Sequence, residues 1–332
     1  MAAEPFYPLP KGAPEDKEAK PKGWLYHTFH GGFIVHTVLI LPWLLGAFVI
    51  IGALYLLYAG SYVAGTAILG LVSLQYVTTP KYWPEFRQLI KDMDPRCYYD
   101  HCELHLPHGV EDIKNEKSML CYHPHGALCV GFSWNGAHAP ELKHIPAKWL
   151  VVDVLMHAPL FGRILRWIGN VGGADAGNMK RLMKEGSNIG IIPGGFEDAT
   201  IMKKGSERIW LKKRKGFIKY ALRFGYRVHP VYNFGECDTF YTFHWLAKLR
   251  MKLNAFKIPA VFFFGNVFMP LFPRTNINMH TFIGKAIELP KIDEPTKEDV
   301  DKWHKTYCDA LQVLFDKHKA EAGRADAVLE MW

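Results

Sequence analysis

The chain contains no Asp, Glu, Lys or Arg between Gly23 and Thr79. Two almost wholly apolar runs lie inside this segment, separated by an Ala-Gly-Ser break at residues 59–61. A hydrocarbon core about 30 Å thick needs roughly 20 helical residues. The segment therefore predicts a two-helix membrane hairpin over residues 33–78, with helices at about 33–58 and 61–77.

Basic residues flank this segment on both sides, at Lys11, Lys17, Lys20, Lys22, Lys81, Arg87 and Lys91. The positive-inside rule places both flanks in the cytosol. The first 22 residues hold five prolines mixed with Glu and Lys, so residues 1–24 are predicted to be a flexible cytosolic tail. Because Pro42 interrupts the first apolar run, a re-entrant wedge in one leaflet is an alternative to two complete spans.

The composition of the whole chain excludes several classes of protein. Of 332 residues, 49% are hydrophobic and 22% charged, which excludes a disordered or fibrous protein. Six cysteines without a paired C-x-x-C spacing exclude a disulfide scaffold. The formal charge of +8 suits anionic partners, but no nucleic-acid-binding motif is present, and we expect no nucleic acid.

After Thr79, short apolar runs that end in glycine or proline alternate with helical stretches. The predicted strands are Met119–Tyr122, Leu150–Val154, Ile189–Ile192, Val228–Tyr232, Ala260–Phe264 and His280–Ile283. The predicted helices are Pro159–Ile168, Asn178–Lys184, Gly216–Phe224, Thr239–Leu253 and a terminal helix capped by Thr296. This alternation predicts an α/β domain over residues 80–332, with helices covering a mostly buried sheet.

The first candidate catalytic motif is His123-Pro124-His125-Gly126, at the end of a predicted strand. Strand ends of an α/β sheet present reactive groups to ligands, and a histidine there can act as a general base. The alternative is that the histidines bond only to the loop backbone. A shared metal ion is a further alternative, with Cys97, His101, Cys102, His105 and His108 nearby; their spacing matches no common zinc pattern, and we expect no metal.

A second motif combines a glycine turn with adjacent carboxylates: Pro193-Gly194-Gly195-Phe196-Glu197-Asp198. Glycine-turn amides can face an oxyanion, and a carboxylate can stabilise a catalytic imidazolium. A basic stretch follows, and its residues Lys212, Lys213, Arg214 and Lys215 are candidates for binding phosphates. Anionic lipid headgroups, or water alone, are alternatives for this stretch.

These motifs, in this order and spacing, resemble the type-2 diacylglycerol acyltransferase family, which includes monoacylglycerol acyltransferases and wax synthases. The resemblance also rests on Arg214-Lys-Gly216-Phe217, on Pro230-Val-Tyr-Asn-Phe-Gly235-Glu236, on the terminal helix and on the hairpin, from about Phe33 to about Gly323. Related glycerolipid acyltransferases carry an Asp five residues after the base. That position is Leu128 or Val130 here, as in the family, so another group must orient the imidazole. The family's usual acid falls at Asp198, next to Glu197, and either residue is a candidate. His229 stands where the family usually has an aliphatic residue.

The resemblance implies an acyltransferase that moves an acyl group from acyl-CoA to diacylglycerol and makes triacylglycerol. His125 is expected to be the base, His123 to position or tune it, Gly126, Gly194 and Gly195 to hold the oxyanion, and the basic stretch to hold CoA phosphates. Acyl-CoA is a substrate, so no cofactor is expected. The expected location is the endoplasmic reticulum membrane, or a lipid droplet surface, with the catalytic domain facing the cytosol.

Several alternatives stay open at this point. The acceptor can be monoacylglycerol, a fatty alcohol or a lysophospholipid instead of diacylglycerol, because acceptor choice depends on cavity-lining side chains. Cys121 and Cys129 flank the histidine motif and leave open a covalent acyl-enzyme. From other classes come a non-catalytic membrane tether or lipid carrier and a metal-dependent membrane hydrolase. A homo-oligomer is compatible with the sequence.

Overall fold

The computed structural model describes residues 32, 36–78, 80–243, 245–255 and 261–332. The chain divides into two compact units. Unit 1 comprises residues 1–98 and 151–178, and unit 2 comprises residues 99–150 and 179–332. The predicted tail at residues 1–24 lies outside the described residues. The domain limits given by the sequence stay a prediction.

Unit 1 is mainly helical. Its helices are α2 (His36–Tyr58), α3 (Tyr62–Val77), α4 (Pro84–Met93), α6 (Asp153–Met156) and α7 (Phe161–Ile168), and it also holds the short strand β4 (Val171–Gly173). The aromatic rings of Trp83, Phe86 and Trp167 pack together and join α4 to α7. Helix α7 ends at Gly169, whose left-handed backbone is typical of a helix C-terminus.

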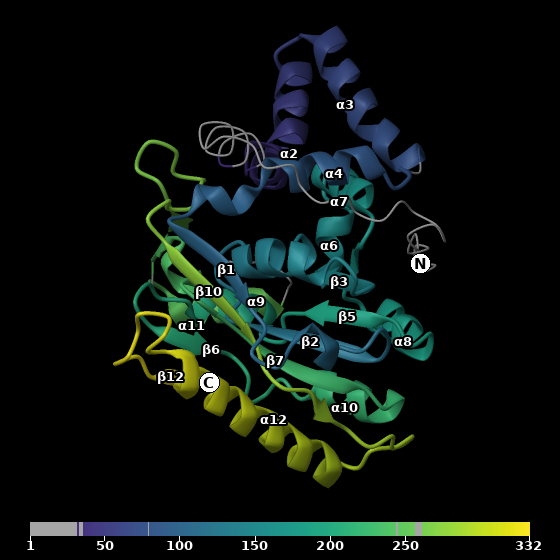
Figure 1. Cartoon of the computed structure of the whole chain (residues 1–332). Coiled ribbons are helices and arrows are strands. Elements are labelled where there is room, and N and C mark those ends of the chain that lie inside the picture. Colours follow the sequence, from purple (N-terminus) through teal and green to yellow (C-terminus); the bar gives the residue numbers. More distant parts are fainter. Residues whose placement is uncertain (1–31, 33–35, 79, 244, 256–260) are drawn as a thin grey trace. The chain divides into compact units, whose positions relative to one another are not determined.

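Helices α2 and α3 form an antiparallel pair joined by residues 59–61, as Figure 1 shows. Among the described residues, no single helix is long and apolar enough to span a bilayer. The two halves of α2, His36–Trp43 and Phe48–Tyr58, meet that criterion together, with a bend of 57° between them. The two helices expected from the apolar runs are present, while residues 33–35 lie outside the described part, and the membrane hairpin itself stays a prediction.

Two local features lie at the bend in α2. Pro42 lies inside the helix, where its ring removes a backbone hydrogen bond and crowds the preceding turn. Gly46 then packs directly on the loop before α7, because a Cβ atom at Gly46 would lie 2.5 Å from the carbonyl oxygen of Pro159. Any larger residue at this position would force the helix away from the loop.

Unit 2 is built on a mixed sheet in the order β1-β10-β7-β2-β5-β3, with β11 paired to β7 (Figure 1). Its strands are β1 (His101–His105), β2 (Ser118–His123), β3 (Ala147–Val151), β5 (Asn188–Ile191), β7 (Arg227–Phe234), β10 (Asn278–Ile283) and β11 (Ile287–Glu288). Strands β3, β5, β2 and β7 run parallel, and β10 and β11 run antiparallel to β7. Two small sheets pair β6 (Glu207–Ile209) with β12 (Leu329–Met331), and β8 (Tyr241–Thr242) with β9 (Phe263–Phe264).

The helices of unit 2 are α5 (Val130–Phe132), α9 (Gly195–Ile201), α10 (Gly216–Phe224), α11 (Ala247–Ala255) and α12 (Lys297–His318), and α8 (Ala176–Lys184) begins in unit 1 and ends in unit 2. Helix α12 starts at Thr296, the cap residue that the sequence predicts, and Thr296 and Asp299 form a capping box there. Phe315 of α12 packs on the rings of Tyr232 and Phe234, which belong to β7. The long last helix therefore lies against the centre of the sheet (Figure 1).

The mixed α/β fold predicted from the sequence is confirmed. Each of the six predicted strands shares at least two residues with an observed strand, and the predicted helix Gly216–Phe224 has the observed limits of α10. Two expectations are wrong. The segment after Val151 turns into helix α6 at Asp153, and Thr239–Leu253 is not one helix, because β8 pairs with β9 before α11 begins. Of the predicted strand at 260–264, residue 260 lies outside the described part and the strand is Phe263–Phe264.

Candidate active site

Three loops that follow parallel strands meet at one edge of the sheet in unit 2. The register pairs Cys121 of β2 with Ile191 of β5, and His123 of β2 with Tyr232 of β7. The His-Pro-His-Gly turn, the Pro-Gly-Gly turn and the Gly235-Glu236 turn therefore begin at the same level. In α/β sheets this carboxyl edge is where ligands bind.

His125 is half-buried, unlike the fully buried His123, and its imidazole has a defined orientation. Nδ1 lies 2.8 Å from the carbonyl oxygen of Gly126. Because a carbonyl oxygen only accepts hydrogen bonds, Nδ1 carries the ring proton, and the lone pair of the neutral ring is on Nε2, 3.3 Å from the sulfur of Cys129. Burial lowers the pKa of His125 below its usual range, which favours this neutral form.

His123 lies behind His125, in the core. Its Nε2 atom is 2.9 Å from the hydroxyl of Tyr307 on α12, and its buried Nδ1 atom has no hydrogen-bond partner among the residues that the structure describes. Burial lowers the pKa of His123 to about 3, so the ring is neutral at physiological pH. Phe217 of α10 packs edge-on against Tyr307 and closes this part of the core. A substrate thus has easier access to His125 than to His123.

Asp198, in the first turn of α9, connects the two glycine-containing turns. Its Oδ2 atom accepts a hydrogen bond of 3.1 Å from the backbone amide of His125, and its Oδ1 atom accepts one from the amide of Trp210. Burial raises the pKa of Asp198 to about 7, against the lowering effect of these two amides. The carboxylate therefore holds the backbone of His125, and the imidazole itself bonds to Gly126.

Glu197, the neighbouring acid, points elsewhere. Its carboxylate forms an ion pair with Arg214, one of the four residues expected to bind phosphates. Lys215 is also paired, with its Nζ atom 2.6 Å from Asp301 on α12. Of the four basic residues, Lys212 and Lys213 are left exposed.

Glu236 was part of a sequence motif without an assigned role, and the structure gives it one in the loop after His125. Its fully buried carboxylate accepts hydrogen bonds from the amides of Val130, at 3.0 Å, and Gly131, at 2.6 Å. A Cβ atom on Gly126 would lie 2.2 Å from the Glu236 carboxylate, and Gly126 has a φ angle of +65°. Burial raises the pKa of Glu236 to about 7. No spacing signal connects Glu236 to Gly126, because the contact joins the loops that follow β2 and β7.

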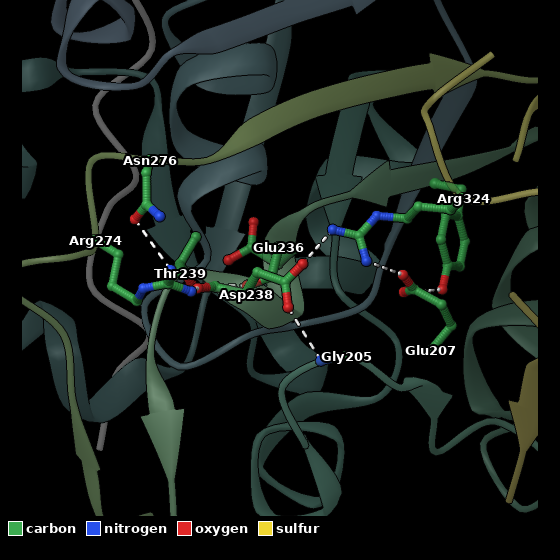
Figure 2. Close-up of polar contacts among 9 residues, drawn as sticks. Gly205, Glu207, Glu236, Asp238, Thr239, Arg274, Asn276 and Arg324 are labelled. Carbon is green, nitrogen blue, oxygen red and sulfur yellow. Dashed lines mark hydrogen bonds and ion pairs between the residues drawn. The ribbon is translucent and has the colours of Figure 1, made fainter. Parts of the chain in front are cut away.

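Figure 2 shows how the Glu236–Asp238 turn is held in place. Arg324 forms ion pairs with Asp238 and with the buried Glu207, and the Glu236 carbonyl accepts a 2.7 Å hydrogen bond from the hydroxyl of Thr239. A pocket of about 410 Å³ opens beside this turn. Its lining includes the basic residues Lys204, Arg274 and Arg324.

The remaining motif residues shape the turns. A Cβ atom on Gly194 would lie 2.3 Å from the Asp198 carboxyl carbon, and one on Gly235 would lie 2.3 Å from a backbone oxygen of Asn278. The amide of Gly195 donates a 3.3 Å hydrogen bond to Ile192 within its own turn. The motif prolines lie in or beside the three strands, with Pro124 after β2, Pro193 after β5 and Pro230 within β7.

Two residues singled out earlier also have defined positions. The sulfur of Cys129 lies 3.3 Å from Nε2 of His125, and burial together with the nearby carboxylates raises the pKa of its thiol well above the usual range. His229 is fully buried in β7, with Nδ1 3.2 Å from the carbonyl oxygen of Gly284. Cys121 is buried in β2.

Taken together, the fold and these contacts define an α/β protein with a histidine-centred site at the carboxyl edge of a parallel sheet. The sequence matches the family model described as "Diacylglycerol acyltransferase" over residues 57–331. It is 30% identical to Diacylglycerol O-acyltransferase 2 of Dictyostelium discoideum, over 60% of this chain and 66% of that protein. It is also 30% identical to 2-acylglycerol O-acyltransferase 1 of Bos taurus, over 69% of this chain and 73% of that protein.

The chain therefore belongs to the diacylglycerol acyltransferase family, and the predicted enzyme class, an acyltransferase, is confirmed. Among solved structures, the chain is similar to the 1-acyl-sn-glycerophosphate acyltransferase PlsC from Thermotoga maritima. The sequence identity is 14% and the TM-score 0.42, over 87% of this chain and 94% of that chain.

Proposed function

We propose that this enzyme transfers an acyl group from acyl-CoA to the free hydroxyl of diacylglycerol and so produces triacylglycerol. Family membership supports acyl transfer to a neutral glycerolipid. The observation that carries the chemistry is the orientation of His125, whose Nδ1 proton is held by the Gly126 carbonyl. An imidazole held in this way presents Nε2 as a base to a hydroxyl group.

In the proposed reaction, the acceptor oxygen attacks the thioester carbonyl while Nε2 of His125 takes the hydroxyl proton. A new ester bond forms, the C–S bond breaks, and the CoA sulfur leaves with the proton that His125 returns. Asp198 acts as a positioning residue, because it holds the backbone of His125. The amides of Gly126 and Gly194 are the proposed oxyanion donors, since that of Gly195 is used within its own turn.

A covalent route through Cys129 is the second candidate, because its sulfur contacts Nε2 of His125. The thiolate is the nucleophilic form of cysteine, and the raised pKa of this thiol opposes its formation. Direct transfer is therefore the mechanism that the electrostatics favour. No cofactor takes part in it, because acyl-CoA is itself a substrate.

We place the reaction at a bilayer surface, where both the acyl chain and the acceptor dissolve. Large apolar side chains are exposed along α2 and α3, including Phe48, Ile51, Tyr58, Val63 and Leu71. Unit 2 also has large exposed apolar side chains, which include Trp245, Leu246, Phe262, Val267 and Phe268. Exposed apolar surface of this extent is typical of membrane or protein contact. An endoplasmic reticulum membrane, or a lipid droplet, with the site facing the cytosol is the proposed location.

The test compares membranes that contain wild type, His125→Ala or Cys129→Ala. Each is incubated with labelled oleoyl-CoA and, separately, with diacylglycerol, monoacylglycerol, a long-chain alcohol or lysophosphatidate, and the lipid products are separated. We expect triacylglycerol from wild type and Cys129→Ala, and a loss of about 10²–10⁴-fold in His125→Ala, the contribution typical of a general base.

Each other outcome changes a defined part of the proposal. A wax ester or diacylglycerol as the main product would change the acceptor and keep the chemistry. Loss of activity in Cys129→Ala, with a labelled acyl-enzyme in wild type, would replace direct transfer by the covalent route. Full activity in a folded His125→Ala protein would show that His125 is not the base. Absence of every product in all membranes would favour a tether or lipid carrier.

A further inference from the structure

Three side chains on neighbouring strands place metal-binding atoms together, away from the histidine-centred site. They are Glu103 and His105 on β1 and His280 on β10, and one ligand atom from each lies within 4.8 Å of the other two. Nε2 of His105 is 3.1 Å from Nδ1 of His280, and 3.8 Å from a carboxylate oxygen of Glu103. These three residues are called the β1–β10 cluster.

The strand register explains how the cluster forms. Strands β1 and β10 are parallel neighbours, and Glu103 lies directly opposite His280. Side chains two residues apart on a strand share a face, so His105 joins Glu103, whereas Cys102 and Leu104 point into the core. The ring of His105 also stacks on Phe282, with the ring centres 4.4 Å apart, which limits its motion.

Two of the ligand-atom separations are close to those around a tetrahedral metal ion. Zinc binds imidazole nitrogen at about 2.0–2.1 Å and carboxylate oxygen at about 2.0–2.2 Å, so two ligand atoms at a tetrahedral angle are about 3.3–3.5 Å apart. The two measured separations, 3.1 and 3.8 Å, fall on either side of that value. We propose that Glu103, His105 and His280 bind a zinc ion, with water as the fourth ligand.

Such an ion would join β1 to the rest of the sheet. Strand β1 is at the end of the sheet order in unit 2 and pairs only with β10 among the described strands. An ion held by residues of both strands adds its binding free energy to the pairing of this edge strand. The rival explanation of the 3.1 Å contact is a hydrogen bond between two neutral imidazoles, which needs no metal.

The experiment measures zinc binding directly and does not depend on acyl transfer. Full-length protein in detergent, without a polyhistidine tag, is stripped with EDTA and titrated with Zn²⁺ against a chromophoric chelator. We expect one zinc ion per chain. His105→Gln and His280→Gln should each weaken binding by at least tenfold, and Glu103→Gln by less, because Glu103 is the most exposed of the three.

His101→Gln is the matched control. His101 lies on the same face of β1, but its ring centre is 6.4 Å from that of His280, and it is not a member of the cluster. It should bind zinc as wild type does. Melting temperatures in EDTA show whether each variant is folded, and zinc should raise the melting temperature of wild type and His101→Gln but not of His280→Gln.

A zinc affinity that is the same in wild type and the folded His105→Gln and His280→Gln proteins would overturn the proposal. So would a protein that takes up no zinc, and the imidazole hydrogen bond would then explain the contact. Because the readouts are metal content and melting temperature, failure here leaves the proposed acyltransferase reaction untouched.

Discussion

At the scale of single residues, Gly126 combines a left-handed backbone with a close contact to a buried carboxylate. Its φ angle is +65°, and a Cβ atom would lie 2.2 Å from the carboxylate of Glu236. Gly205 provides a matched control, because its φ angle is +72° and nothing lies within 4 Å of its Cβ position. Comparing alanine substitutions at Gly126 and Gly205 therefore separates the cost of backbone strain from the cost of the steric contact.

We expect Gly205→Ala to lower the free energy of unfolding by about 1–2 kcal/mol, the usual cost of a left-handed conformation, and to keep activity. Gly126→Ala should cost more and abolish acyl transfer, because Glu236 must move and release the amides of Val130 and Gly131. Thermal unfolding and initial rates in detergent measure both effects. Equal melting temperatures and full activity in the two variants would contradict the role given to Glu236.

Glu236 also predicts a dependence of stability on pH. Burial raises its folded-state pKa to about 7, above the value of about 4.3 for a free glutamate. Between these values the folded state binds more protons than the unfolded state, so stability falls as the pH rises from about 4.3 to about 7. Glu236→Gln removes this contribution, whereas the similar one from Asp198 remains.

The expected result is a smaller drop in melting temperature between pH 5 and pH 7.5 in Glu236→Gln than in wild type. Glu294→Gln, at an exposed position, is the control and should follow wild type. An unchanged pH dependence in Glu236→Gln would show that this carboxyl group titrates normally. The comparison of slopes, rather than of absolute melting temperatures, isolates the titration from the loss of a hydrogen bond.

At the scale of elements, there are two candidate surfaces for binding CoA phosphates. One is the basic segment between β6 and α10, and the other is the pocket beside the Glu236–Asp238 turn. In the segment, Arg214 and Lys215 are paired with carboxylates, and Lys212 and Lys213 are exposed. The backbone of the same segment contacts Asp198 through Trp210, next to His125. This proximity favours Lys212 and Lys213 as the groups that bind CoA phosphates.

We expect the double variant Lys212→Gln/Lys213→Gln to raise the KM for acyl-CoA several-fold, with little change in kcat and a weaker dependence on salt. The comparison variant, Lys204→Gln/Arg274→Gln, changes two basic residues of the pocket. If only the comparison variant raises KM, the phosphates bind in the pocket instead.

The sequence predicts local elements better than contacts between distant segments. The predictions of helix α10 and of the Thr296 cap depend on local sequence alone, and both are correct. Strand β1 was missed because His101–His105 is polar, and only its pairing with β10 makes it a strand. The role of Glu236 and the β1–β10 cluster were missed for the same reason, since each joins residues more than 100 positions apart.

For the histidine motif, one property could be predicted from the sequence and another could not. Its chemistry could be predicted from residue type and position at a strand end, whereas the difference between the two histidines could not. That difference comes from α12, which brings Tyr307 to His123, and from Gly126, which orients His125. The roles predicted for Glu197 and Asp198 likewise depend on side-chain directions, and only Asp198 contacts the His125 loop.

At the scale of the whole molecule, exposed apolar side chains allow the proposed attachment to a membrane to be tested. Leu71 and Leu74 of α3 are 72% and 53% exposed, so they contribute little to packing within unit 1. On α12, Val313 is similarly exposed, at 66%, in a helix that carries charged residues throughout its outer face. Substitutions at Leu71 and Leu74 can therefore be compared with one at Val313, which is similarly exposed but lies outside the predicted membrane helices.

We expect Leu71→Lys/Leu74→Lys to reduce the fraction of protein that stays with membranes in alkaline carbonate, because a lysine at the centre of a membrane helix costs about 2.5–3.5 kcal/mol. Val313→Lys should stay with membranes like wild type, since its surface faces water in the proposed arrangement. If the double variant is retained as fully as wild type, α3 does not enter the hydrocarbon core, and membrane attachment must come from α2 or from the exposed aromatic residues of unit 2. Loss of wild type itself from the membranes would mean that the apolar surface of α2 and α3 is covered by protein and not by lipid.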